Sequence, residues 1–308
     1  MLGLNAAFKA TEASPHHGWF NGCMSTRPLP SLYLSHGSPM IALEPSPAAA
    51  FLERLGPAIE ACFGRPRAVL VVSPHTATRE PVVQTAARHE AIHDFGGFPA
   101  PLYQLRYDAP GDPALAQEVA GRLGAAGLPV HTLEGGELDH GIWTVLRRAW
   151  PQADLPVLPL SLVPNWSAAR QWAVGAALAP LREQGVLIIG SGSLTHNLRR
   201  LMRQRGTPVA AVAPDVQVFR DWVQATASAR DWAGLRDWPA AAPGALEQHP
   251  TDEHWLPFYI GAGAGGEEAV PQRIHASVDQ GVMAMDSYAF GAPALELAQA
   301  LQVEGVAA

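Results

Sequence analysis

The stretch AVLVVSPH, residues 68–75, decides the fold class, because five apolar side chains follow one another before a histidine ends the run. A second stretch of this kind, VLIIGSGSLTH, occupies residues 186–196. An apolar run without polar alternation is typical of a strand that is covered on both faces, as in the parallel sheets of α/β proteins. We therefore expect a central sheet with helices packed on both of its sides.

The rest of the chain alternates between short apolar runs and helical patterns. Further strands are expected at residues 31–34 and 157–162, with a weaker one at 129–133, and helices at 48–62, 113–125, 142–149 and 168–183. Asp112-Pro113 is typical of a helix N-terminus. This alternation predicts a single three-layer α/β/α domain around a largely parallel or mixed sheet, of the phosphorylase/hydrolase-like type. The Pro- and Gly-rich segments 95–113 and 239–250 are expected to form long ordered loops over a site.

Residues 1–28 differ from this pattern. They show no periodicity and lack the continuous apolar stretch of a secretory signal, and Met24 offers a second start just before the first strand. We expect an N-terminal extension over residues 1–28, either flexible or an upstream start-site artefact, and one catalytic domain over residues 29–308.

Composition excludes several classes of function. The chain has 308 residues, 48% of them hydrophobic, and a net charge of −7 without a block of Lys or Arg, so neither a nucleic-acid partner nor a membrane partner is expected. Cys23 and Cys62 are too few for a disulfide framework, which favours a reducing cytoplasm. Lys9 is the only lysine and no G-x-S-x-G motif occurs, which argues against Schiff-base, P-loop and serine-elbow chemistry.

The placement of the histidines is the most informative feature. His36, His75 and His196 each lie at or just beyond the end of a predicted strand, where open α/β sheets bind their ligands. His140 and His254 each lie near the predicted start of a helix, which Asp139 is placed to cap in the first case. Imidazoles are common ligands of zinc and non-haem iron. A single histidine after a strand is more often structural, but five in such settings predict a metal site.

Other residues that attract attention are given ordinary roles. Four further histidines are expected to be surface or hydrogen-bonded polar residues: His89, His93, His131 and His275. Three tryptophans are expected to be packing anchors: Trp222, Trp232 and Trp238. The GSGS turn at residues 190–193 is a weak candidate for a phosphate-binding loop, because it lacks both a G-x-G-x-x-G pattern and a lysine.

Six segments of the chain, in order from residue 32 to about residue 264, resemble the extradiol ring-cleaving dioxygenase superfamily that includes protocatechuate 4,5-dioxygenase. They are LYLSHGSPM, VLVVSPHT, FGGFPAPLYQLRYDAPGDPALA, LDHGIWTVL, GSGSLTHNLR and HPTDEHWLPFYIGAGA. The resemblance is closest to the 4,5-DOPA dioxygenase-like group. One departure lies beside His75, where Ser73-Pro74-His75-Thr76 stands in place of the usual Ser-Ala-His-Trp.

The resemblance implies a non-haem, metal-dependent extradiol dioxygenase that cleaves a catechol-type ring with O2 to a muconic semialdehyde. It implies one divalent metal, Fe(II) for activity or Zn(II) as found in related proteins. His36, His75 and His254 match the metal ligands. His196 matches the acid/base histidine of the superfamily, and His140 matches a histidine on the substrate side of the metal.

The third ligand has an alternative. The protocatechuate enzymes place a carboxylate in this region, so Glu253 could replace His254, but adjacent side chains at a helix start point about 100° apart and only one can face the site. We choose His254. His249, five residues earlier, is expected to shape the loop or to contact substrate.

Two rival functions stay open beside a dioxygenase that acts on a small aromatic diol and O2. One is a zinc-dependent hydrolase of a small amide or ester, with zinc-activated water as nucleophile and His196 as proton shuttle. The other is a protein that binds a metal or small ligand without turnover. Oxygen dependence distinguishes the first rival, and stoichiometric metal without a rate on any catechol would identify the second.

Overall fold

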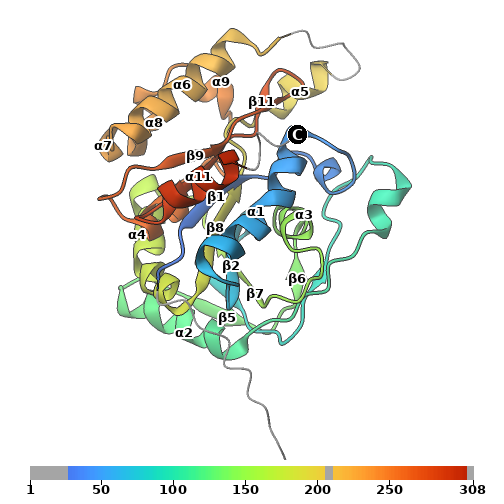
Figure 1. Cartoon of the computed structure of the whole chain (residues 1–308), viewed down its shortest axis with the longest axis vertical. Coiled ribbons are helices and arrows are strands. Elements are labelled where there is room, and N and C mark those ends of the chain that lie inside the picture. The colour runs from blue at the N-terminus through green and yellow to red at the C-terminus, as the bar shows by residue number, and fades with distance from the viewer. Residues whose placement is uncertain (1–26, 205–210, 304–308) are drawn as a thin grey trace, which may run out of the picture.

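Eight strands in the described part of the chain, residues 27–204 and 211–303, form one mixed sheet through the middle of the protein (Figure 1). The structure is a computed structural model. The strand order is β5-β3-β7-β2-β8-β1-β12-β9. Their bounds are β1 Ser31–Ser35, β2 Ala68–Ala77, β3 Val82–Gln84, β5 His131–Leu133, β7 Val157–Leu162, β8 Val186–Gly192, β9 Gln272–His275 and β12 Ser287–Phe290. Two short ribbons stand apart from it: β4 Glu90–Ala91 with β6 Glu137–Leu138, and β10 Val278–Asp279 with β11 Met283–Ala284.

The centre of the sheet is parallel and its margins are antiparallel. β7, β2, β8 and β1 pair in parallel, so their carboxyl ends meet at one edge of the sheet. β12 runs antiparallel to β1, β9 to β12, and β3 to β7. Every residue of β8 and the first seven of β2 are buried, which explains their uninterrupted apolar runs.

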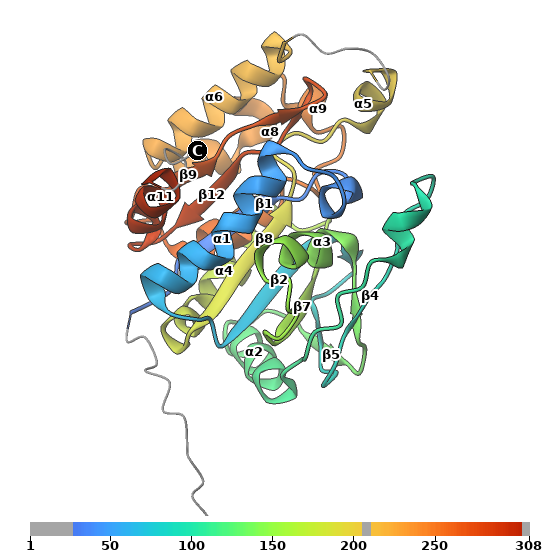
Figure 2. The same ribbon diagram turned by 45° about the vertical axis from the view of Figure 1, so that its right-hand side comes forward.

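Helices cover both faces of the sheet (Figure 2). Successive side chains of a strand point to opposite faces, so Leu32 and Val69 join one core while Tyr33 and Leu70 join the other. The first core is closed by α1 Pro47–Phe63, α3 His140–Ala149 and α11 Ala294–Val303, and the second by α2 Pro113–Ala125, α4 Ala168–Leu178, α10 Pro257–Gly265 and α6 Pro214–Ser228. Shorter helices are α5 Leu198–Gln204, α7 Trp232–Arg236, α8 Trp238–Ala241, α9 Ala245–Gln248, and the 3-10 helices η1 Pro39–Ala42, η2 Ala100–Gln104 and η3 Ala179–Gln184. The predicted three-layer α/β/α fold is confirmed.

The structure differs from the sequence expectations at three segments. Residues 239–250 are not a long loop, because α8 and α9 fill most of the segment. The GSGS stretch is mostly strand, since parallel pairing with β1 continues through Gly192. α10 begins at Pro257, so His254 lies in the turn before that helix and not in its first turn.

Two expectations concern the chain as a whole. In the described ranges, no helix combines the length and the apolar character that crossing a membrane requires. The predicted extension over residues 1–28 lies outside the described residues apart from its last two, so its boundary stays a prediction.

Candidate metal centre and active site

Three neighbouring parallel strands bring their histidines to the same edge of the sheet. His36 directly follows β1, His75 lies near the end of β2, and His196 lies four residues beyond β8. β8 runs between β1 and β2, so the three residues approach one point from adjacent strands. This is the carboxyl edge at which the sequence pattern predicts a site.

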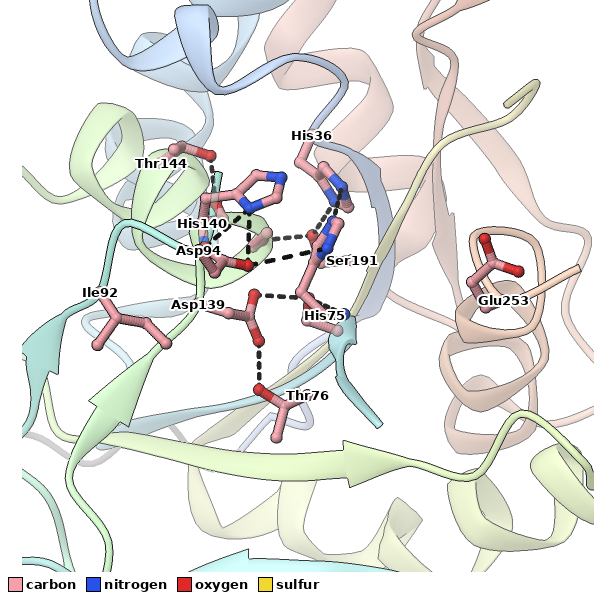
Figure 3. A network of polar contacts seen from close by, with 12 residues as sticks. His36, His75, Thr76, Ile92, Asp94, Asp139, His140, Thr144, Ser191 and Glu253 are labelled. Atoms are coloured by element: carbon pink, nitrogen blue, oxygen red, sulfur yellow. Dashed lines mark hydrogen bonds and ion pairs between the residues drawn. The ribbon is translucent and has the colours of Figure 1, made fainter. Parts of the chain in front are cut away.

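His140 and His254 reach this edge from the two helical layers. His140 is the first residue of α3 (Figure 3). The carbonyl of His254 accepts hydrogen bonds from the Ser193 N–H at 3.1 Å and from the Tyr33 hydroxyl at 3.0 Å. A Cβ at Gly192 would lie 2.2 Å from that carbonyl oxygen, so only glycine lets the turn approach β8 this closely. The structure therefore brings all five predicted histidines together.

Ring nitrogens of the three predicted metal ligands face one another. The Nε2 atom of His75 lies 3.2 Å from Nε2 of His36 and 3.3 Å from Nε2 of His254. Nitrogen ligands held ~2.0–2.1 Å from one metal ion are themselves ~3.0–3.4 Å apart. The spacing fits two pairs of neighbouring ligands of a single ion.

Other donors lie close to this set. The donor atoms of His36, His75 and His140 lie within 4.8 Å of one another, and so do those of His196, Glu253 and His254. His75 belongs to the first group, but its Nε2 atom also lies close to Nε2 of His254 in the second group. This contact joins the two groups. The tightest donor set therefore contains one member from β1, one from β2 and one from the turn before α10.

Hydrogen bonds fix which nitrogen of His36 carries the proton. The Ser191 hydroxyl donates to the carbonyl of Gly141 at 2.5 Å, so it can only accept from Nδ1 of His36 at 2.9 Å. Nδ1 of His36 is therefore protonated, and its Nε2 presents a lone pair to the cluster (Figure 3). Ser191 was not singled out from the sequence, although it lies within the GSGS stretch.

A hydrogen bond fixes the proton of His254 in the same way, and a charge contact favours the same tautomer of His75. The Glu253 carboxylate accepts from Nδ1 of His254 at 3.2 Å, which leaves Nε2 as a lone-pair donor. Nδ1 of His75 lies 3.9 Å from the Asp94 carboxylate, a charge contact that favours the proton on Nδ1. Three lone pairs that point at each other repel, and a cation between them removes the repulsion. The donor set therefore fits a divalent metal ion.

Asp94 is a second site residue, beside Ser191, that the sequence analysis missed. Its carboxylate accepts from both the backbone N–H and Nδ1 of His140, each at 3.0 Å. Burial raises the pKa of Asp94, but the hydrogen bonds from His140 outweigh this and hold the pKa below its ordinary value. Only its position after His93 in the distinctive HDFGG stretch could have drawn attention to it.

Asp139 does not cap α3 with its side chain, contrary to expectation. Its buried carboxylate instead accepts from the hydroxyls of Ser73 at 2.7 Å and Thr76 at 2.5 Å. Burial raises its pKa, and these two hydroxyls offset part of the rise. Asp139 thus ties the start of α3 to the segment that carries His75.

His196 lies beside the three predicted ligands, but it takes no part in the short Nε2 contacts between them. Its ring stacks on that of His254, with centroids 3.4 Å apart and planes 13° apart. Its backbone N–H donates to the carbonyl of Gln248 at 2.8 Å. Together with His75, His140 and His254, it lines a cavity of about 1010 Å³.

Burial keeps four of the clustered imidazoles, those of His36, His75, His196 and His254, neutral at pH 7. It lowers the pKa of His75 to about 3 and that of His196 to about 4. Burial, and then the neighbouring imidazoles, lower the pKa of His36 and His254 well below that of free histidine. Neutral imidazole is the form that binds a metal ion.

The remaining histidines fall into two groups. His131 is exposed and pairs with Glu80, and Nε2 of His275 bonds the Ser277 hydroxyl, as expected. His89 and His93 do not fit that expectation, because each has a buried ring nitrogen without a partner among the described residues. Trp232 and Trp238 are core residues and Trp222 packs against that core, as predicted.

His249 makes stability depend on pH. Its Nε2 donates to the carbonyl of Leu194 at 2.8 Å, which shapes the segment before His196. Burial lowers its pKa to about 4 from 6.5. Between these pH values the unfolded chain takes up a proton that the folded chain refuses, so the free energy of unfolding falls on acidification. The full shift corresponds to about 3 kcal/mol.

We expect His249→Gln to lessen this pH dependence in the metal-free protein. The slope of unfolding free energy against pH between 6.5 and 4.5 should fall by up to about 1.4 kcal/mol per pH unit, measured by urea unfolding. His131→Gln, at an exposed position, is the matched control and should keep the full slope. Equal slopes for His249→Gln and the unsubstituted protein would contradict the assignment.

Gly141 makes room for the cluster. A Cβ at this position would lie 2.4 Å from Oγ of Ser73 and 3.1 Å from ring carbons of both His36 and His75. We expect Gly141→Ala to destabilise the fold by about 1–3 kcal/mol and to weaken metal binding, because the rings must shift. Chemical unfolding and metal titration measure the two effects.

A matched glycine serves as control. A Cβ at Gly121, in α2, would meet no atom within 4 Å, so Gly121→Ala should stabilise the helix by about 0.5–1 kcal/mol and leave metal affinity unchanged. Unchanged metal affinity in Gly141→Ala would show that the positions of the His36 and His75 rings do not depend on the absence of a side chain at Gly141.

Comparisons with known proteins agree with this geometry. The chain is 38% identical over 265 residues to a 4,5-DOPA dioxygenase extradiol of Beta vulgaris, covering 84% of this chain and 96% of that protein. It is 36% identical over 276 residues to a protein of the same name from Escherichia coli K12, covering 87% and 97%. The crystal structure of the uncharacterized protein JW3007 from Escherichia coli K12 matches with a TM-score of 0.71 and 30% identity, covering 85% of this chain and all of that one.

Residues 30–291 match the family described as the catalytic LigB subunit of aromatic ring-opening dioxygenase. The match includes every strand of the eight-stranded sheet and all five clustered histidines. Dioxygenases of this family use a metal ion, which agrees with the donor set. The chain belongs to the LigB family of aromatic ring-opening dioxygenases.

Proposed function

We propose that this protein is a non-haem extradiol dioxygenase that cleaves a catechol-type ring with O2 to a muconic semialdehyde. The observation that carries the proposal is the convergence of three imidazole Nε2 atoms, two of them on rings that line a large cavity. His36, His75 and His254 would hold one divalent metal, Fe(II) for activity, with Zn(II) as the competing ion. The relatives named for DOPA, itself a catechol, support this substrate class.

The chemistry divides between the metal and the surrounding side chains. When bound, ferrous iron supplies neighbouring open coordination positions for a diol and for O2. The chain supplies the proton movements. His196 is neutral at pH 7, so a ring nitrogen can accept a proton from one catechol hydroxyl and return it later.

His140 is suited to hold the second catechol hydroxyl. Asp94 accepts a hydrogen bond from Nδ1 of His140, so in the neutral ring Nε2 carries no hydrogen and can accept a hydrogen bond from that hydroxyl. Phe95 and Phe98 line the same cavity and give the ring apolar contact. The reaction adds both atoms of O2 to the catechol, so no further reductant is needed.

The proposal also covers the extent and setting of the enzyme. The catalytic domain would span residues 29–308. A reducing cytoplasm is the expected compartment, because ferrous iron persists there.

Glu253 is expected to support the third ligand and not to replace it. One oxygen of its carboxylate, Oε1, accepts from Nδ1 of His254 and from the Thr251 hydroxyl, so Glu253 already bonds the ring nitrogen of His254 that does not face the other ligands. We expect His254→Ala to lose stoichiometric metal, and Glu253→Ala to retain it with affinity ~10–100-fold lower. Metal analysis after gel filtration measures both. Full metal in His254→Ala would overturn the choice of ligand.

The experiment that tests the function is anaerobic reconstitution with Fe(II), followed by a catechol panel in an oxygen electrode. We expect one O2 consumed per ring opened, with a yellow semialdehyde product. The same protein loaded with Zn(II) and given small amides and esters tests the hydrolase alternative. Hydrolysis at equal rates with and without O2, and no oxygen uptake on catechols, would overturn the proposal.

A further inference from the structure

The cavity that the histidines line is larger than a catechol ring needs. Its volume is about 1010 Å³, at the upper end of the ~300–1,000 Å³ that pockets for drug-sized molecules enclose. A single aromatic ring with two hydroxyls is much smaller than such a molecule. A diol held beside His75 and His254 would therefore leave much of the cavity for the substituent that the ring carries.

Apolar side chains from separate segments form much of the wall apart from the histidines. Met40 comes from η1, Phe98 from the loop before η2, Met202 from α5 and Met283 from β11. Methionine side chains are flexible and polarisable, so a wall with three of them adapts to the shape of an apolar group.

α5 leaves two large apolar side chains uncovered on this wall. Leu198 and Met202 are 48% and 60% exposed, and both line the cavity. They are four positions apart in the helix, so they lie on the same face, with Met202 one turn, ~6 Å, further along. Leu201 packs against both hydrophobic cores and thereby holds the helix in place. The uncovered pair therefore lies on an anchored helix.

This apolar pair continues the site that the histidines form. α5 begins two residues after His196, so the helix leads away from the proposed acid/base residue. Isolated apolar side chains on a surface are ordinary, whereas apolar side chains grouped in a cleft mark a binding site. A ring substituent that lies along α5 would cover Leu198 and Met202 and remove their apolar area from water.

The cavity also restricts the charge of such a substituent. Its described lining includes the carboxylates of Glu44, Glu253 and Asp279, and neither lysine nor arginine lines it in that part of the chain. An anionic substituent would be repelled. A charged group of either sign would also lose hydration against the apolar side chains of α5. The α5 wall therefore suits an uncharged apolar group.

We propose, on the basis of the proposed function, that the preferred substrates are catechols whose side chain ends in an uncharged apolar group of about the size of a phenyl ring, and that Leu198 and Met202 bind this group. Burial of such a group corresponds to ~10–100-fold in affinity. A catechol with a short apolar side chain should be a poorer substrate, and unsubstituted catechol the poorest.

The experiment uses full-length protein loaded with Fe(II) and three uncharged catechols, so that charge does not contribute to the differences. These are 4-(2-phenylethyl)catechol, 4-ethylcatechol and catechol itself. Oxygen uptake gives kcat/KM for each. Calorimetry without O2 gives the dissociation constant for each, which does not depend on turnover. We expect the phenylethyl compound to be favoured over the ethyl compound by ~10–100-fold in both measurements.

Variants identify the residues responsible. Leu198→Asn combined with Met202→Gln should lower the ratio of phenylethyl to ethyl compound by at least ~5-fold, because the apolar contact is lost. Met202→Leu keeps an apolar side chain of similar size and should keep the ratio. Leu295→Asn, at a position in α11 that is 53% exposed and outside the cavity, is the matched control and should also keep it. An unchanged ratio in the double variant would overturn the assignment to α5.

The outcomes separate this inference from the proposed function. Faster oxygen uptake with 4-ethylcatechol than with the phenylethyl compound, or equal dissociation constants for the two, would overturn the apolar site and leave the dioxygenase proposal standing. Tighter binding of the phenylethyl compound without oxygen uptake on any of the three would support the apolar site and contradict the dioxygenase proposal. An unchanged ratio together with a dimer that the double variant breaks would assign this face to a second copy of the chain and overturn the inference.

Discussion

Replacing His75 by alanine is expected to abolish stoichiometric metal binding and to lower ring-cleavage activity by more than ~100-fold. Its Nε2 atom contacts Nε2 of both His36 and His254. Without His75, only two imidazole ligands remain, and both of the close Nε2 contacts in the ligand set are lost. Loss of a residue that only supports a ligand already costs ~10–100-fold, and loss of the ligand itself should exceed this. Metal analysis and oxygen uptake on the same preparation measure the effect.

The control for this substitution is His131→Ala. His131 is exposed and pairs with Glu80, away from the cavity, so the variant should keep both metal and activity. One metal ion per chain in His75→Ala, with activity close to that of the unsubstituted protein, would contradict the proposed centre.

Replacing His196 by alanine should leave metal content unchanged while kcat falls by ~10²–10⁴-fold, the usual contribution of general acid–base catalysis. The ring stacks on His254 and lines the cavity, which suits proton transfer to a substrate held at the metal. Metal content, melting temperature and oxygen-dependent turnover are measured on the same preparation. Unchanged turnover per metal-loaded molecule would end the acid/base proposal.

Two other results would reassign His196. Loss of metal together with activity would make it a fourth ligand, as in a zinc site of four histidines. Loss of stability with normal turnover would make it a structural residue. Asn197→Ala is the matched control, because Asn197 bonds the Glu247 carbonyl and the Arg200 N–H and thus holds the same turn without the imidazole.

The central strands and the histidines at their ends could be predicted from sequence because their signals are local. β2 and β8 are buried on both faces, and this produces apolar runs that no exposed segment would show. Parallel neighbours share a carboxyl edge, so a histidine after each strand must meet the others. The relation between His36, His75 and His196 needs no knowledge of distant contacts.

The antiparallel margin of the sheet lacks such a signal. β9 is four residues long and mostly half-buried, so its apolar content is low. Arg273 within it pairs with the buried Asp286, which makes the segment look polar in sequence. Strands held by long-range pairing and ion pairs cannot be separated from loops by periodicity alone.

The side chains that orient the histidines could not be predicted from the sequence either. Asp94 lies 46 positions before His140, and their contact depends on how the loop after β4 meets α3. Asp139 occupies the expected capping position, but the hydroxyls of Ser73 and Thr76, more than 60 positions away, turn its carboxylate elsewhere. Propensity fixes where a helix begins, whereas tertiary contacts decide which atoms a side chain bonds.

The most direct test of the central claim is the origin of the oxygen atoms in the product. Fe(II)-loaded protein is given a catechol under ¹⁸O2 in ordinary water, and the ring-opened product is analysed by mass spectrometry. We expect ¹⁸O in the new carboxylate, which does not exchange with water as an aldehyde oxygen does. A product that carries only solvent oxygen, or one that forms at the same rate without O2, would contradict ring-cleaving dioxygenase activity and favour hydrolysis.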